Sequence, residues 1–283
     1  MKAIDIIKQL RDLTSISIAK CSKAVNAVYD ESLTSTQIIE NAMTQLRKDG
    51  IKVAADLSTR VAEEGKVCIL HENNKVVMVL ISCNTDFVTR SEGFLGFARH
   101  VAKYLTHNPI DGMHEDQVIA QKRNDLMLQC GENITITEAK VLDVPEGAVV
   151  GIYTHNAIRF DIKDVAAEAA AVVLHGSDKE LAVGIAQSIV GNSVKPRILS
   201  ASDMTEEIKK RELDIINDQL SSAADFANLS EEIREKRFKG SFEKRIKEIT
   251  LLSQEYIFSD SGESIESMLG QNKILSFCYL HGK

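Results

Sequence analysis

The sequence lacks several features that mark large protein classes. Its 283 residues contain no tryptophan and only 5% aromatic residues, so aliphatic side chains must form most of the core, which favours a helix-rich fold. No segment approaches the roughly 18 apolar residues of a membrane-spanning helix. The start of the chain, from Met1 to Asp5, has no apolar signal core. We therefore expect a soluble, cytoplasmic protein with no membrane partner.

Catalytic and metal-binding signatures are also missing. The sequence has no glycine-rich phosphate loop and no nucleophile elbow. Its five cysteines are widely spaced and form no Cys-x-x-Cys pair, so reduced thiols are expected rather than a zinc site. Cys83 and His155 are conceivable as a nucleophile pair, but nothing supplies a third, orienting group. We expect no enzyme, no metal and no cofactor of its own.

The charge balance is acidic. The formal net charge is −7 and the isoelectric point is about 5.6, whereas general nucleic-acid binding requires a strongly basic surface. Direct contact with nucleic acid is therefore not expected. The lysines and arginines of residues 234–247 leave open a nucleic-acid adaptor as a less favoured alternative.

Three short helices are predicted for residues 1–50. Apolar residues recur at helical spacing in each of them. Thr34 and Gln37 have the spacing of a capping box at the start of the third helix. Gly50 stands where a helix end requires a positive φ angle.

A hairpin followed by a helix is predicted twice. The first hairpin turns at Asn73-Asn74, because asparagine tolerates positive φ, and its helix covers 92–105. The second has its tip at 153–156, a return strand at 158–165 and a helix at 178–190. This repeated layout indicates an α+β fold with two related subdomains.

Residues 204–247 differ from the rest of the chain. They are rich in charge and favour helix, with a break between 221 and 230. Their apolar seam is thin. We expect an antiparallel helix pair that projects from the body.

Three segments place polar groups beside apolar ones: 85–88, 131–134 and 153–156. Phe87 is either the first core residue of the following helix or an exposed tip, and composition favours the core. Gly131 is expected in a turn. His155 is expected on a solvated hairpin tip.

The sequence resembles the bacterial elongation factor Ts family over nearly its whole length. The clearest match is Cys-Asn-Thr-Asp-Phe-Val at 83–88, after a hydrophobic strand. Gly-Glu-Asn-Ile at 131–134 and the histidine tip at 155 follow in the same order. The opening, 7–14 and Cys21-x-Lys23-Ala24, is also similar.

The resemblance implies a fold in parts. It implies a three-helix module like a ubiquitin-associated (UBA) domain, a core of two duplicated α+β subdomains with antiparallel hairpin sheets, and a protruding antiparallel helical coiled coil. The implied bounds are 1–52 for the module, 53–63 for a linker, 64–145 for the core N-subdomain, 146–203 and 248–283 for the core C-subdomain, and 204–247 for the coiled coil.

The resemblance also implies a function. Family members promote guanine nucleotide exchange on elongation factor Tu, a translational GTPase that itself holds GDP and Mg²⁺. Phe87 would insert near the Mg²⁺ and phosphate site, with its approach fixed by Asp86, and Gly131 would let a partner helix come close. The implied Tu-binding residues are Thr85, Asp86, Phe87, Val88, Gly131, His155, Ile18, Ala19, Lys23 and Ile265.

Some positions depart from the family pattern. The first loop is Thr-Ser-Ile-Ser at 14–17, where the family usually has glycines, and Ser22 replaces a lysine. We also expect no counterpart of the C-terminal tail module that many members carry. We expect a divergent member whose N-terminal module binds more weakly. The alternative function is a Tu-binding chaperone or assembly subunit without exchange activity.

Overall fold

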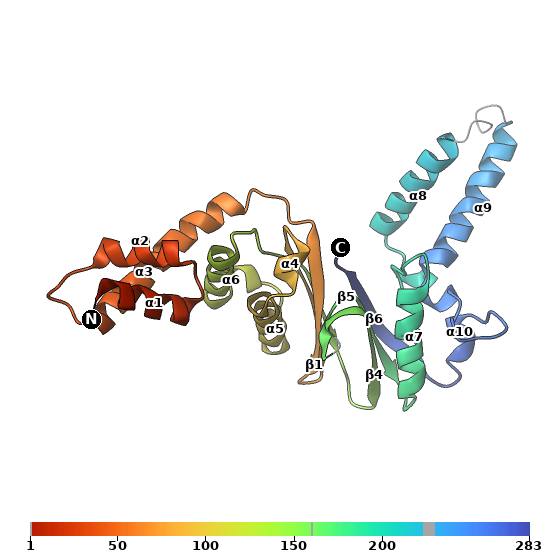
Figure 1. The fold of residues 1–283 in the computed structure, drawn as a ribbon. Coiled ribbons are helices and arrows are strands. Elements are labelled where there is room, and N and C mark those ends of the chain that lie inside the picture. The colour runs from red at the N-terminus through yellow and green to blue at the C-terminus, as the bar shows by residue number, and fades with distance from the viewer. Residues whose placement is uncertain (1, 160, 223–229) are drawn as a thin grey trace. The chain divides into compact units, whose positions relative to one another are not determined.

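The computed structural model describes residues 2–159, 161–222 and 230–283. The chain divides into two compact units (Figure 1). Unit 1 comprises Met1–Val141, Asn156–Ala167 and Leu280–Lys283, and unit 2 comprises Leu142–His155 and Glu168–Tyr279. The fold is mixed α/β with antiparallel strand pairing, as the sequence predicts at this level.

Three helices precede the first strand, and helices and strands are mixed along the rest of the chain. The helices are α1 (Ala3–Thr14), α2 (Ile18–Val28), α3 (Ser35–Leu57), α4 (Asp86–Thr89), α5 (Glu92–His107), α6 (Gln117–Cys130), α7 (Lys179–Gly191), α8 (Glu206–Ser221), α9 (Glu231–Ile249) and α10 (Ile265–Met268). The strands are β1 (Glu64–Glu72), β2 (Lys75–Cys83), β3 (Thr135–Asp143), β4 (Ala148–Arg159), β5 (Ile162–His175) and β6 (Lys273–His281).

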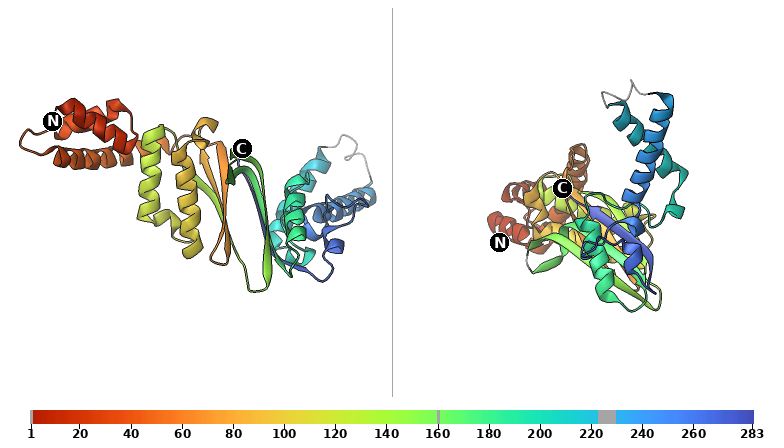
Figure 2. Two further views of the ribbon diagram at one scale, coloured as in Figure 1. Left: turned by 60° about the horizontal axis from the view of Figure 1, so that its bottom comes forward. Right: turned by 90° about the vertical axis from the view of Figure 1, so that its right-hand side faces the viewer.

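The first three helices pack together in unit 1, as both views of Figure 2 show. Thr34 caps α3 as predicted, because its hydroxyl accepts from the Gln37 amide and the Gln37 side chain accepts from the Thr34 amide. The predicted end at Gly50 is wrong. The helix continues to Leu57 because Ala54 and Leu57 are buried in the core of unit 1, and Gly50 is a buried interior residue against Leu128.

Within unit 1 the strands pair in the order β3-β2-β1-β5, and β5 takes part with its first residues, up to Ala167. β1 and β2 form the predicted hairpin, with Glu72 paired to Lys75 and with Asn73 and Asn74 at φ 53° and 56°. α5 covers the hairpin and buries its predicted apolar face. That face consists of Phe94, Phe97, Ala98, Val101 and Leu105.

In unit 2, β5 pairs with both β4 and β6, and α7 belongs to the same hydrophobic core. The predicted tip at 153–156 is wrong, because these residues lie within β4, which extends to Arg159. The return strand β5 begins at Ile162 rather than at 158. Longer strand pairing than the sequence suggested accounts for both differences.

α8 and α9 lie side by side in unit 2 (Figures 1 and 2). The predicted break between 221 and 230 falls largely on residues 223–229, outside the described part of the chain. Near the base of the pair, the fully buried carboxylate of Glu212 lies 2.9 Å from Arg197 Nη1 and accepts a 2.6 Å hydrogen bond from Arg245 Nε. No helix in the described ranges has both the length and the apolar character needed to cross a bilayer.

Candidate functional site

Phe87 is an exposed aromatic tip. Among the described large apolar side chains it is the most exposed, at 81%. It lies in α4, a single helical turn that is separated from the end of β2 by Asn84 and Thr85. The composition-based preference for a core position is therefore wrong, and the ring is available to another molecule.

The turn that carries Phe87 is anchored by its neighbours. Thr89 is fully buried, and Val88 is half-buried against the core of unit 1. Because successive helical residues point about 100° apart, burying Val88 and Thr89 directs Phe87 outward. The exposed ring thus follows from the packing of the turn.

Glu132 holds the loop that precedes Phe87. Its carboxylate accepts the main-chain amides of Asn84 at 3.1 Å and Thr85 at 2.9 Å, and the Thr85 hydroxyl at 2.6 Å. The predicted segments 85–88 and 131–134 are thereby joined in unit 1. Gly131 is the residue predicted from the second segment, and Glu132 is not among the predicted contact residues. A carboxylate two residues after a helix end was the available signal.

Two asparagines extend this support. The Asn133 amide donates to Asn84 Oδ1 at 2.9 Å. Asn84 Nδ2 donates to the Val61 carbonyl at 2.5 Å, and Asn133 Nδ2 donates to the Arg60 carbonyl at 2.7 Å. The side chains of Asn84, Glu132 and Asn133 are called the loop frame below.

Gly131 ends α6 with φ 75°, and its amide donates to the Met127 carbonyl at 2.9 Å. This left-handed conformation favours glycine, so the expected turn glycine is confirmed. A Cβ built on Gly131 would have no atom within 4 Å. The position is therefore open toward solvent as well as conformationally required.

Asp86 does not belong to the loop frame. Its carboxylate is about half exposed and lies 3.3 Å from Arg90 Nη2. An exposed ion pair of this kind contributes about 0–1 kcal/mol. In this structure Glu132, rather than Asp86, fixes the loop that positions Phe87. The Asp86 carboxylate remains on the surface beside the ring.

The remaining predicted residues fall in different places. Ile18, Ala19 and Lys23 are exposed on the first turns of α2 in unit 1. Ser15, in the loop where the family usually has glycine, has φ 56°. His155 is exposed in unit 2, where its Nδ1 lies 3.2 Å from the Tyr153 hydroxyl.

Ile265 requires a correction. Its side chain is fully buried in the hydrophobic core of unit 2, at the start of α10. In this conformation it supports the surface from inside and offers no area for direct contact. The contact role of Ile265 was implied by the family resemblance, which does not determine burial.

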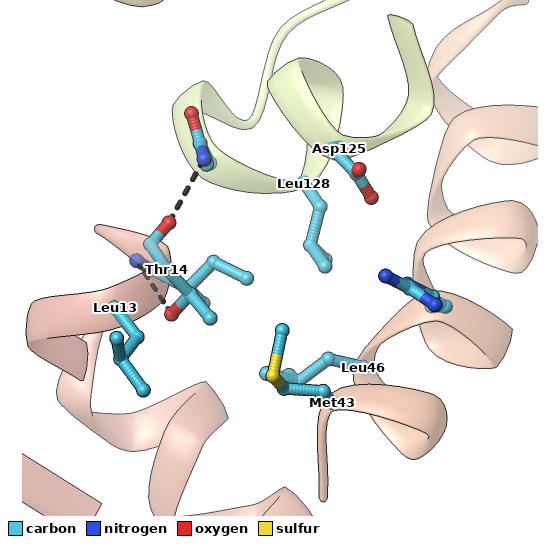
Figure 3. A pocket seen from close by; sticks show the side chains of 9 residues that line it. Leu13, Thr14, Met43, Leu46, Asp125 and Leu128 are labelled. Atoms are coloured by element: carbon cyan, nitrogen blue, oxygen red, sulfur yellow. Dashed lines mark hydrogen bonds between the residues drawn. The ribbon is translucent and has the colours of Figure 1, made fainter. Parts of the chain in front are cut away.

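A small cavity of about 190 Å³ lies among α1, α3 and α6 in unit 1 (Figure 3). Its lining combines apolar and polar side chains in about equal measure, and Gln129 Nε2 donates to the Thr14 carbonyl at 2.8 Å. Arg47 and Asp125 are its charged lining residues, and no histidine, cysteine or serine lines it. The cavity therefore lacks the histidine, cysteine and serine side chains of common nucleophilic sites, and Asp125 is its one carboxylate.

The imagined Cys83 nucleophile is chemically unsuitable. Burial, with a smaller effect of the Glu132 carboxylate, raises the pKa of the Cys83 thiol to about 12. The reactive form of a cysteine is the thiolate. Cys83 therefore stays protonated near neutral pH, and its sulfur donates to the Thr85 carbonyl at 3.1 Å.

Comparison with known proteins gives a consistent result. Residues 84–281 match the sequence model of the family described as elongation factor TS. A Psychrobacter arcticus protein named elongation factor Ts is 27% identical over 281 residues, covering 96% of this chain and 87% of the relative. Proteins of the same name from Idiomarina loihiensis and Hahella chejuensis are 30% and 31% identical, covering 89% of this chain and 80% and 81% of their own lengths.

Proposed function

The chain belongs to the elongation factor Ts family, and from this premise we propose that it is a guanine nucleotide exchange factor for the translational GTPase elongation factor Tu. The observation that carries the mechanism is Phe87, an exposed ring on a turn held by the loop frame. In this proposal the ring enters the GTPase near its Mg²⁺ and phosphate site. Tu holds both GDP and Mg²⁺, and the exchange factor needs no cofactor and catalyses no covalent step.

Exchange requires a difference in affinity. The factor must bind nucleotide-free Tu more tightly than Tu with GDP, and this coupling is reciprocal. Shifting the equilibrium between GDP-bound and factor-bound Tu by a factor of ~10⁴ takes a difference in binding free energy of about 5.5 kcal/mol. Burying a phenylalanine contributes about 1.5–3 kcal/mol, so Phe87 needs additional contacts.

The family supplies candidates for these contacts. We include in the proposal that Thr85, Asp86, Val88 and Gly131 adjoin the ring at the interface. The exposed residues Ile18, Ala19 and Lys23 form a separate contact in the N-terminal helices, and His155 forms another in unit 2. Their exposure, and the open space at Gly131, support this assignment.

The domain plan of the family is part of the same proposal. It treats α1–α3 as a UBA-like module, α8 and α9 as a coiled coil, and the remaining α+β elements as a duplicated core. The packing of α1–α3 and the pairing of α8 with α9 support the first two assignments.

The test is release of a fluorescent GDP analogue from Tu. Phe87→Ala should reduce the stimulated release rate by roughly 10- to 150-fold, as expected from losing about 1.5–3 kcal/mol of binding in the transition state. Because Phe87 is exposed, the variant should unfold at the parental temperature. The release rate with Phe87→Leu should lie between the rates with the parental protein and with Phe87→Ala, since leucine keeps part of the apolar area.

Ile110→Ala is the matched control, since Ile110 is an exposed apolar residue of unit 1 in the loop after α5. It should leave release unchanged. Parental exchange by Phe87→Ala would refute insertion of the ring. Tight Tu binding by the unaltered protein without any acceleration would instead favour the chaperone or assembly function.

A further inference from the structure

We propose that Val61 forms a second apolar contact with the same GTPase, next to Phe87 and held by the same loop frame. The inference rests on the proposed function and adds a residue to its interface. Val61 lies between α3 and β1, before the residues matched by the family model.

Val61 is unusually exposed for an aliphatic residue. At 73% it is second only to Phe87 among the described large apolar side chains. A single exposed valine is common on protein surfaces, so exposure alone identifies nothing. The side chain does, however, contribute little to packing within the chain, and its substitution should leave the fold intact.

The main chain at Val61 is fixed. Its carbonyl accepts from Asn84 Nδ2 at 2.5 Å, and the preceding carbonyl of Arg60 accepts from Asn133 Nδ2 at 2.7 Å. Asn133 is buried, and its amide donates to Asn84 Oδ1. The segment is therefore held by two side chains, and the Asn84 side chain in turn accepts a hydrogen bond from the main-chain amide of Asn133.

These two side chains also belong to the frame that positions Phe87. Asn84 is three residues before Phe87, and Glu132, next to Asn133, accepts the Asn84 and Thr85 amides. Val61 and Phe87 are thus two exposed apolar side chains on one hydrogen-bonded support. Ordering costs weaken binding when loops must be fixed in the complex, and here both positions are fixed before the partner arrives.

The hydrogen-bonded support that Val61 shares with Phe87 indicates which partner would contact Val61. A partner that buries Phe87 meets Val61 on the same support, with Asp86 and Arg90 as charged neighbours of the ring. The fitting surface on the GTPase is apolar with a polar edge. Such a contact adds to the affinity that Phe87 alone does not provide.

The experiment measures the concentration of factor that gives half-maximal GDP release from Tu. Val61→Ser should raise this concentration roughly five- to tenfold, as expected when a valine no longer leaves water on binding. Val61→Ile should stay near the parental value, because it preserves an apolar side chain. Both variants should unfold at the parental temperature.

Val118→Ser is the matched control, because Val118 is another exposed valine of unit 1, at 55%, on the first turn of α6. It should leave the half-maximal concentration unchanged. If the unaltered protein accelerates release and Val61→Ser behaves like Val118→Ser, the Val61 contact is overturned and the exchange function stands.

The opposite failure gives a different pattern. If the unaltered protein binds Tu without accelerating release, and Val61→Ser weakens that binding, the Val61 contact is supported and the proposed exchange activity is overturned. If the unaltered protein neither binds Tu nor accelerates release, both are overturned.

Discussion

At the scale of single residues, Glu132 shows how a half-buried carboxylate can position an exposed side chain. It accepts three hydrogen bonds from the two residues before Asp86, and two of the donors are main-chain amides. Main-chain donors fix the path of the loop rather than one side chain. Glu132 is therefore a positioning residue for Phe87 that has no need to contact the partner itself.

Two substitutions of Glu132 should differ in how far they disorder the loop that precedes Phe87. Glu132→Ala removes both acceptor oxygens and with them all three hydrogen bonds. We expect stimulated GDP release to fall roughly tenfold and the free energy of unfolding to fall by about 1.5–3 kcal/mol. Glu132→Gln keeps one oxygen for the amides and an amide group for the Thr85 hydroxyl, so it should retain most of the activity. Charge-assisted hydrogen bonds are stronger than neutral ones, which accounts for the remaining loss.

The measurement combines release kinetics with hydrogen exchange of the Asn84 and Thr85 amides. In Glu132→Ala these amides should exchange faster, and in Glu132→Gln they should stay largely protected. Unchanged protection in Glu132→Ala together with full activity would show that Glu132 does not position the loop.

At the scale of helices and strands, features that depend on neighbouring residues were predictable from the sequence. The turn at Asn73-Asn74 and the cap at Thr34 need only local hydrogen bonds and asparagine's tolerance of positive φ. The ends of α3 and β4 were not predictable. Gly50 stays helical because it packs on Leu128, 78 positions away in the sequence, and no local signal reports such a partner.

Two glycines inside helices should respond oppositely to alanine. A Cβ on Gly240, which is exposed in the middle of α9, would meet no atom within 4 Å, so Gly240→Ala should stabilise the protein by about 0.5–1 kcal/mol. A Cβ on Gly184 of α7 would lie 2.1 Å from the Tyr256 hydroxyl oxygen. Gly184→Ala should therefore destabilise it by about 1–3 kcal/mol.

Thermal and denaturant unfolding of the two variants would check both signs. The pair controls for the mutation itself, because each replaces a helical glycine with the strongest helix former. A lower unfolding temperature for Gly240→Ala would mean that its surroundings are not open.

At the scale of the whole molecule, the candidate site depends on contacts between distant parts of unit 1. Asn133 reaches the Arg60 carbonyl across 73 positions, and Glu132 reaches Thr85 across 47. The sequence identified Phe87 and its neighbours by their resemblance to a family. It placed Asn84 and Glu132 in two separate motifs but did not indicate that they are joined, and it did not indicate Val61, because hydrogen-bond partners this far apart are defined only by the folded chain.

The last residues of the chain provide a similar long-range contact. Gly282 donates its amide to the Ala167 carbonyl at 2.7 Å, and the Gly65 amide donates to the Lys283 carbonyl at 3.1 Å. A Cβ on Gly282 would lie 2.3 Å from the Gly65 carbonyl oxygen, a main-chain atom that cannot rotate away. The two glycines thus allow main chain to pack against main chain.

Gly282→Ala should therefore push the final segment away from β1 and destabilise unit 1 by about 1–3 kcal/mol. The unfolding temperature should fall, and the Gly65 amide should lose protection from hydrogen exchange. Gly96→Ala in α5 is the control, since a Cβ there meets no atom within 4 Å and should not destabilise the protein. If Gly282→Ala matched Gly96→Ala in stability and in Gly65 protection, the close packing of these two segments would not exist in solution. The contact would then contribute nothing to holding β1 in place.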